Sequence, residues 1–169
     1  MTYMDVGNVN VDARFSGRNE MSPVSPYLVL RYTLAKFELI NEGDDSGTHK
    51  KELQLWQHLG ALPAFEGYLE SGRGMGHSLH MASEMGAYTL SDRGTWLALK
   101  DKLELRLVLE SDPQLLNPYQ VMLVNPKRHS HANINLAREF AQWMVSSTGQ
   151  GAIGDFRING EVLFVPSAR

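Results

Sequence analysis

The order of apolar and polar positions predicts short strands that alternate with helices. Residues 37–41 alternate as a β-strand does, and a polar turn follows them. Residues 48–58 then repeat apolar side chains at helical spacing. A glycine-rich stretch at 72–76 leads into a second amphipathic segment at 77–86. Both predicted helices therefore begin directly after a polar or glycine-rich loop.

The rest of the chain continues the alternation. We expect strands at 87–90, 106–109 and 119–124, the last buried because its residues form a continuous apolar run, and helices at 95–102, 133–145 and 148–156. Asp92 is placed to cap the helix that follows it. Residues 27–36 fit either a helix or a strand, and no internal repeat is present. The pattern predicts an α/β fold, with an irregular lead-in over residues 1–36 and one α/β domain over residues 37–169.

Composition narrows the choice of partners. The 169 residues carry a net charge of −3, with Lys and Arg scattered along the chain, so a nucleic-acid backbone is not an expected partner. With no cysteine, the chain has neither disulfides nor thiolate metal sites. The first 19 residues are polar and mixed, which does not match a secretory signal peptide. We expect Trp56, Trp96 and Trp143 to pack in the core, because each lies on a helical apolar face.

The two loops carry the groups that bind anions. A helix start offers unpaired backbone N–H groups and the positive end of the helix dipole, and glycine allows a ligand to approach the backbone closely. The first loop adds two hydroxyl groups. The predicted oxyanion-binding residues are Ser46, Gly47 and Thr48 in the first loop and Gly74, Met75, Gly76, His77 and Ser78 in the second.

Several alternatives stay open for these residues. The first loop also fits an ordinary N-cap without a ligand, and the second fits a glycine-rich turn that matches the dinucleotide fingerprint poorly. Asp45-Ser46-Gly47 is the loop tripeptide of aspartic proteases, but it occurs once and leads into a helical pattern. His77 and His80, with His129 and His131, suggest zinc without completing a ligand spacing, and we expect no metal, no cofactor and no catalytic residue.

A family resemblance covers about three quarters of the chain. Residues 43–52, GDDSGTHKKE, and residues 72–105, which begin GRGMGHSLHMASEMGAYTLSDRG, resemble the tungstate-binding proteins of ABC transporters. Residues 117–126, NPYQVMLVNP, and residues 140–166, which contain WMVSSTGQGAIGDFRINGEVLFVP, resemble later segments of the same family in the same order. The chain is thus similar to this family over four segments.

The resemblance implies a fold, a ligand and a partner. It implies a type II periplasmic-binding-protein fold, of which this chain holds mostly one lobe plus returning segments. It also implies binding of tungstate or molybdate, delivery of the anion to a membrane permease, and work in the periplasm. Two features depart from the family: no counterpart of its amino-terminal lobe precedes Phe37, and Glu42 stands where the family usually has arginine. The alternative is a truncated or diverged homologue that keeps the fold without the ligand, in the form of a homodimer.

Overall fold

The computed structural model describes residues 3–5, 8–12, 38–60 and 63–168, which form two compact units. One unit comprises Gly7–Leu116, and the other comprises Met1–Val6 with Asn117–Arg169. In the described part of the chain, every helix is too short or too polar to span a lipid bilayer.

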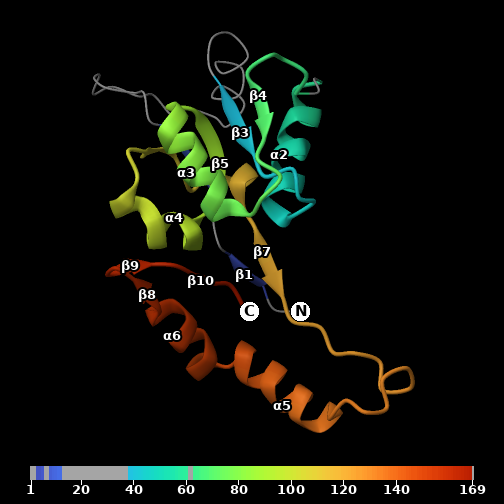
Figure 1. Ribbon diagram of the computed structural model, residues 1–169. Helices are drawn as coiled ribbons and strands as arrows, with labels where there is room; N and C mark the ends of the chain where they lie inside the picture. The colour runs from blue at the N-terminus through green and yellow to red at the C-terminus, as the bar shows by residue number, and fades with distance from the viewer. Residues whose placement is uncertain (1–2, 6–7, 13–37, 61–62, 169) are drawn as a thin grey trace. The chain divides into compact units, whose positions relative to one another are not determined.

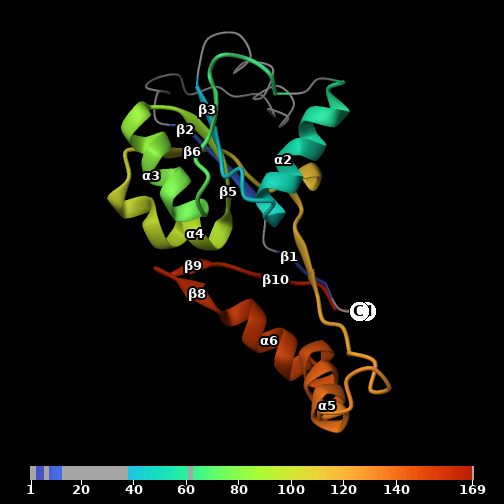
Figure 2. The same ribbon diagram turned by 45° about the vertical axis from the view of Figure 1, so that its right-hand side comes forward.

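The larger unit is built on a mixed five-stranded sheet in the order β4-β3-β5-β2-β6. Figure 1 labels β4, β3 and β5, and Figure 2 labels β2 and β6. Strand β3 (Leu39–Asn41) lies between β4 (Tyr68–Glu70) and β5 (Tyr88–Asp92) and runs parallel to both. Strand β2 (Asn8–Asp12) pairs antiparallel with β5 and with β6 (Arg106–Leu109). The parallel strands require crossover connections, and two of these connections are helices.

Helices cover both faces of this sheet. Helix α2 (Gly47–His58) connects β3 to β4 and lies on one face, whereas α3 (Met75–Met85) and α4 (Arg93–Leu99) lie on the other, as Figures 1 and 2 both show. The 3-10 helices η1 (Lys100–Lys102) and η2 (Pro113–Leu115) complete the unit. The core under α2 consists of Leu39, Leu55, Trp56, Tyr88, Leu90 and Leu115. On the α3 face, the side chains with no exposed surface include Ile40, Leu79, Ala82 and Leu97.

Local sequence explains where the helices begin and end. The Ser46 hydroxyl caps α2 by accepting from the His49 amide at 3.2 Å, and the Asp92 carboxylate caps α4 by accepting from the Thr95 amide at 2.8 Å. Helix α3 begins at Gly74 without a side-chain cap and ends at Gly86, which adopts the left-handed conformation at φ 62°. The start of α3 therefore has no protein side chain bonded to its backbone.

The smaller unit pairs two helices with short strands. Strand β1 (Tyr3–Asp5) lies antiparallel between β7 (Pro118–Gln120) and β10 (Val165–Pro166), and β8 (Arg157–Ile158) pairs with β9 (Glu161–Val162). Asn159 and Gly160, both at positive φ, form the turn between β8 and β9. Helices α5 (Ile134–Val145) and α6 (Ser147–Asp155) contact each other.

Most predicted elements form, within one or two residues at each end. The α/β class is confirmed, and so are the helices that begin after each loop. Strand β4 was not predicted, because its three residues are too few to show a period. Within the stretch expected to be irregular, β1 and β2 form, while residues 27–36 lie outside the described part of the chain. The predicted boundary at residue 37 stays a prediction.

Two predictions about burial are wrong. The run at 119–124 forms a strand only up to Gln120, and Met122, Leu123 and Val124 are exposed. Trp143 is also 43% exposed, whereas Trp56 and Trp96 are buried as predicted. An apolar run or stripe is buried only where another element covers it, and no described part of the smaller unit covers these side chains.

Candidate functional site

The two predicted anion-binding loops lie at the same edge of the five-stranded sheet. The first joins β3 to α2 and the second joins β4 to α3. Because β3 and β4 are adjacent and parallel, their carboxyl ends meet at one edge, and both helices begin there. This edge is where ligands bind in open α/β sheets.

Ser71 ties the two loops together. Its amide donates to the Asn41 carbonyl at 2.8 Å, and its hydroxyl lies 3.4 Å from the Glu42 carbonyl. The same hydroxyl is 2.7 Å from the Ser78 hydroxyl, in the first turn of α3. Gly43 approaches β4 so closely that a Cβ there would lie 2.9 Å from the Cβ of Glu70. The start of α3 is thereby held next to the end of β3.

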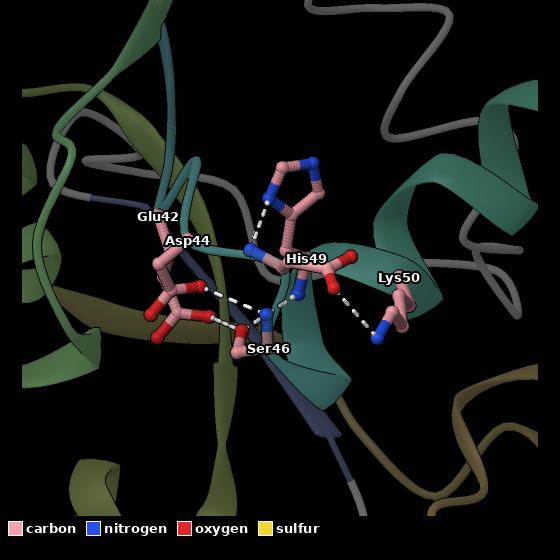
Figure 3. Close-up of polar contacts among 6 residues, drawn as sticks. Glu42, Asp44, Ser46, His49 and Lys50 are labelled. Atoms are coloured by element: carbon pink, nitrogen blue, oxygen red, sulfur yellow. Dashed lines mark hydrogen bonds and ion pairs between the residues drawn. The ribbon is translucent and has the colours of Figure 1, made fainter.

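The start of α2 is a compact hydrogen-bonded turn (Figure 3). The Ser46 amide donates to Asp44 Oδ1 at 3.0 Å, and the Asp45 amide donates to His49 Nδ1 at 3.3 Å. Asp45 adopts a positive φ of 61°, and its carboxylate pairs with Lys50 at 3.1 Å. His49 therefore acts within the turn, as expected for a residue just inside the helix.

Glu42 engages one of the predicted oxyanion-binding residues. Its side chain is only 3% exposed, and its carboxylate accepts a hydrogen bond from the Ser46 hydroxyl. The carboxylates of Glu42 and Asp44 lie side by side and face Ser46 in Figure 3. Because the Ser46 hydroxyl also accepts from the His49 amide, both of its hydrogen-bonding functions are engaged within the loop.

The charge of Glu42 is disfavoured by its surroundings. Burial raises the pKa of its carboxyl group above the usual range, and the carboxylates of Asp44 and Asp92 raise it further. The hydrogen bond from Ser46 and the nearby His49 act in the opposite direction without cancelling the effect. Glu42 is thus closer to protonation than an ordinary glutamate.

A second buried carboxyl group, that of Glu52, stabilises the loop between β3 and α2. Glu52 on α2 is 1% exposed and accepts from the Asn41 amide nitrogen at 2.5 Å and from Trp56 Nε1 at 3.0 Å. Asn41 in turn accepts from the Gly43 amide at 2.7 Å. Burial raises the pKa of Glu52, although the bonds from Asn41 and Trp56 oppose the shift. This chain of contacts fixes where the loop leaves β3.

Four amide N–H groups are left for a ligand. Among the described residues, the amides of Gly47 and Thr48 at the start of α2, and of Met75 and Gly76 at the start of α3, make no hydrogen bond. Their positions in the first turns explain this, since these groups have no partner within a helix. They are the donors that the two loops can offer to an oxyanion.

The other predicted residues have internal roles in this arrangement. The amides of His77 and Ser78 donate to the Gly74 carbonyl at 2.9 and 3.3 Å. The Ser78 side chain is fully buried and bonded to Ser71. The His77 side chain is exposed, and Gly74 is exposed at the N-cap position. The ligand-binding roles of these residues stay predictions.

The sequence did not single out Asn41, Ser71 and Glu52. Each lies beside a strand end or one helical turn inside α2, where parallel strands bring distant residues together. Because strand β4 was not predicted, Ser71 at its end had no place in the predicted site. Prediction of the three-residue strand between Gly67 and Ser71 would have placed Ser71 at the same sheet edge as the two loops.

The structure gives no support to an aspartic-protease-like site at Asp45 or to a zinc site at the histidines. Asp45 is exposed and ion-paired, and its loop leads into helix α2 rather than into strands. His129 and His131 pack edge to face at 6.0 Å. No group of three or more His, Cys, Asp or Glu side chains that could hold a metal ion exists among the described residues.

Comparisons with known proteins identify the family of this chain. A family profile for the PBP superfamily domain matches residues 35–148. A tungstate-binding protein TupA of Peptoclostridium acidaminophilum is 46% identical over 135 residues, which cover 79% of this chain and 47% of that protein. The chain thus spans about half the length of the curated relatives that it matches.

Two solved structures share the fold of this chain and are at least 30% identical to it in sequence. The tungstate-binding protein TupA from Desulfovibrio alaskensis G20 superposes with a TM-score of 0.81 at 30% identity, covering 99% of this chain and 70% of that one. The tungstate ABC transporter from Geobacter sulfurreducens gives a TM-score of 0.76 at 34% identity, covering 92% and 66%. The resemblance read from the sequence is confirmed.

Proposed function

This chain belongs to the PBP superfamily, and from that premise we propose that it is the oxyanion-binding component of an ABC-type uptake system for tungstate or molybdate. In this role it performs no catalysis. It works in the periplasm, holds a tetrahedral dianion and delivers it to the membrane permease of the system. The names of similar proteins from three bacteria support this assignment.

One observation carries the proposal. Two helices begin side by side at the carboxyl edge of one sheet, and their first-turn amides, at Gly47, Thr48, Met75 and Gly76, have no partner among the described residues. Hydrogen bonds through Ser71 hold the two starts together. An oxyanion accepts several N–H donors at once, so converging helix starts match its chemistry.

Affinity depends on using both starts. The dipole of one exposed helix stabilises an anion by about 0.3 to 1 kcal/mol, which is far below micromolar binding. Several aligned donors with little competing water are therefore needed. Selectivity for tungstate over sulfate then rests on cavity size, because both are tetrahedral dianions with the same donor requirement.

A pair of substitutions at Gly47 tests the proposal. A Cβ at this exposed position meets no atom within 4 Å, so both Gly47→Ala and Gly47→Asp are expected to fold. The aspartate adds a negative charge at the first turn of α2, which suits the helix dipole but repels an incoming dianion. In calorimetry we expect Gly47→Asp to bind tungstate at least about tenfold more weakly than Gly47→Ala. Equal affinity of the two variants would contradict the site.

A second candidate function is favoured by Glu42 and by the smaller unit. A carboxylate at the start of α2 opposes a dianion, and the smaller unit exposes apolar side chains at Leu136, Phe140 and Trp143 on one face of α5. These features fit a diverged homologue that binds no anion and buries this face in a homodimer. Light scattering tests it: a strict monomer at all concentrations excludes the dimer.

A further inference from the structure

We propose that Glu42 makes oxyanion binding at this site depend on the uptake of one proton, which lies between the Glu42 carboxyl group and an oxygen of the bound oxyanion. The proposal rests on the proposed function and adds a specificity-determining residue to it. The site would take up oxyanions basic enough to share a proton, such as tungstate and molybdate, in preference to weakly basic sulfate.

The position of Glu42 carries the argument. Glu42 is 3% exposed, and its carboxylate accepts from the hydroxyl of Ser46, the N-cap residue of α2. The first two amides of that helix, at Gly47 and Thr48, have no partner among the described residues. A buried carboxylate at a helix start uses the same positive potential that a bound dianion would use. The ionised form of Glu42 therefore competes with the ligand from within the protein.

The charged groups around Glu42 do not relieve this competition. Asp44 in the same loop and Asp92 at the end of β5 add negative charge, and His49 on α2 is the group that opposes them. Burial and the two carboxylates already raise the pKa of Glu42. A dianion placed beside Glu42 would raise it further, because like charges in one site cannot both be fully ionised.

Proton uptake removes the conflict in a balanced step. The ionised carboxylate and the dianion together carry three negative charges, and with one proton released by the buffer they form a complex that carries two. The carboxyl group then donates a hydrogen bond to an oxyanion oxygen instead of repelling it. Its hold on the Ser46 hydroxyl weakens at the same time, which frees that hydroxyl to donate to the ligand as well.

Calorimetry measures this proton directly. Tungstate is titrated into the protein at a series of pH values from about 7 to 9, in buffers that differ in ionisation enthalpy. We expect the binding enthalpy to vary linearly with the ionisation enthalpy of the buffer, with a slope that corresponds to the uptake of about one proton. We also expect the affinity to fall about tenfold for each unit by which the pH rises. Glu42→Gln, which keeps the size of the side chain and is uncharged, is expected to bind with no proton uptake, without this pH dependence, and more tightly at pH 8.

Asp44→Asn is the matched control. It removes a carboxylate from the same loop, but Asp44 accepts from the Ser46 amide and is exposed, so about one proton is still expected on binding. Tungstate binding by the unmodified protein without proton uptake would overturn the role of Glu42 and leave the proposed function standing. If neither the unmodified protein nor Glu42→Gln binds tungstate or molybdate at any pH, the proposed function fails and this inference fails with it.

Discussion

Single buried residues decide the shape of the candidate site. Glu52 lies one helical turn inside α2, where its carboxylate accepts from Asn41 and Trp56, and Asn41 in turn accepts from the Gly43 amide. The loop therefore leaves β3 in a direction that α2 determines. The sequence alone does not indicate this contact, because a glutamate in a helical pattern is normally interpreted as a solvent-exposed polar residue.

Removing the Glu52 carboxyl group is expected to destabilise the fold. Glu52→Ala leaves the Asn41 amide and the Trp56 indole N–H buried without their acceptor, and each such group costs about 1 to 3 kcal/mol. We predict a loss of about 2 to 4 kcal/mol in the free energy of unfolding, measured by urea denaturation. Glu84→Ala, at an exposed position of α3, is the control and should change stability by less than about 0.5 kcal/mol. Equal stability of the two variants would contradict a structural role for Glu52.

The raised pKa of Glu42 predicts a direction of change with pH. A carboxyl group whose folded pKa lies above its unfolded value, about 4.3, stabilises the fold fully below that value and loses this contribution as pH rises through the folded pKa. Without ligand, the free energy of unfolding of the unmodified protein should therefore fall relative to Glu42→Gln as pH rises from about 4 toward neutrality. Denaturant titrations of both proteins across this range test it, and a constant difference would argue against the shift.

Asp44 should give the opposite trend. Desolvation raises its pKa, but the hydrogen bonds from the side chain and backbone of Ser46 together outweigh it and lower the pKa overall. Its contribution is therefore present above the unfolded pKa and lost as pH falls through the folded pKa. As pH rises, the Asp44→Asn variant is therefore expected to lose stability relative to the unmodified protein, whereas Glu42→Gln is expected to gain it.

At the scale of elements, local signals in the sequence are sufficient for most helix starts. Ser46, Asp92, Asn133 and Ser146 each cap a helix through the side-chain acceptor that their residue type offers. The starts of α2 and α3 could therefore be placed from the sequence. Their meeting at one sheet edge could not, because it depends on the short strand β4 and on parallel pairing between strands distant in the chain.

The junction between α5 and α6 offers a test at this scale. A Cβ at Gly149 would lie 2.1 Å from the Trp143 carbonyl oxygen, whereas a Cβ at Gly151 meets no atom within 4 Å. We predict that Gly149→Ala lowers the free energy of unfolding by about 1 to 3 kcal/mol. Gly151→Ala, inside the same helix, should raise it by about 0.5 to 1 kcal/mol. Thermal unfolding of both variants checks the pair, and a neutral Gly149→Ala would mean that the junction adjusts freely.

At the scale of the whole molecule, the two units differ in how well their apolar side chains are covered. The larger unit has a sheet with helices on both faces, and its core follows the predicted pattern. In the smaller unit α5 has no buried residue, and Leu136, Phe140 and Trp143 share an exposed face. Sequence periodicity predicted the helix correctly but not its exposure, because burial depends on partners that periodicity does not identify.

This exposed face makes the dimer hypothesis testable. If the face is buried in a homodimer, Phe140→Ser lowers the mass measured by light scattering toward that of the monomer. Arg138→Gln, at an exposed position on the opposite side of α5, should leave the mass unchanged. Identical masses for Phe140→Ser and the unmodified protein would exclude this face as the interface.

If the amides at the starts of α2 and α3 bind one oxyanion, both sets must respond to the same ligand. Nuclear magnetic resonance can follow the backbone amide signals of the protein while tungstate is added. We expect saturable shifts at Gly47, Thr48, Met75 and Gly76 that fit one common Kd. Shifts confined to one helix start, or no saturable shift at either, would contradict it.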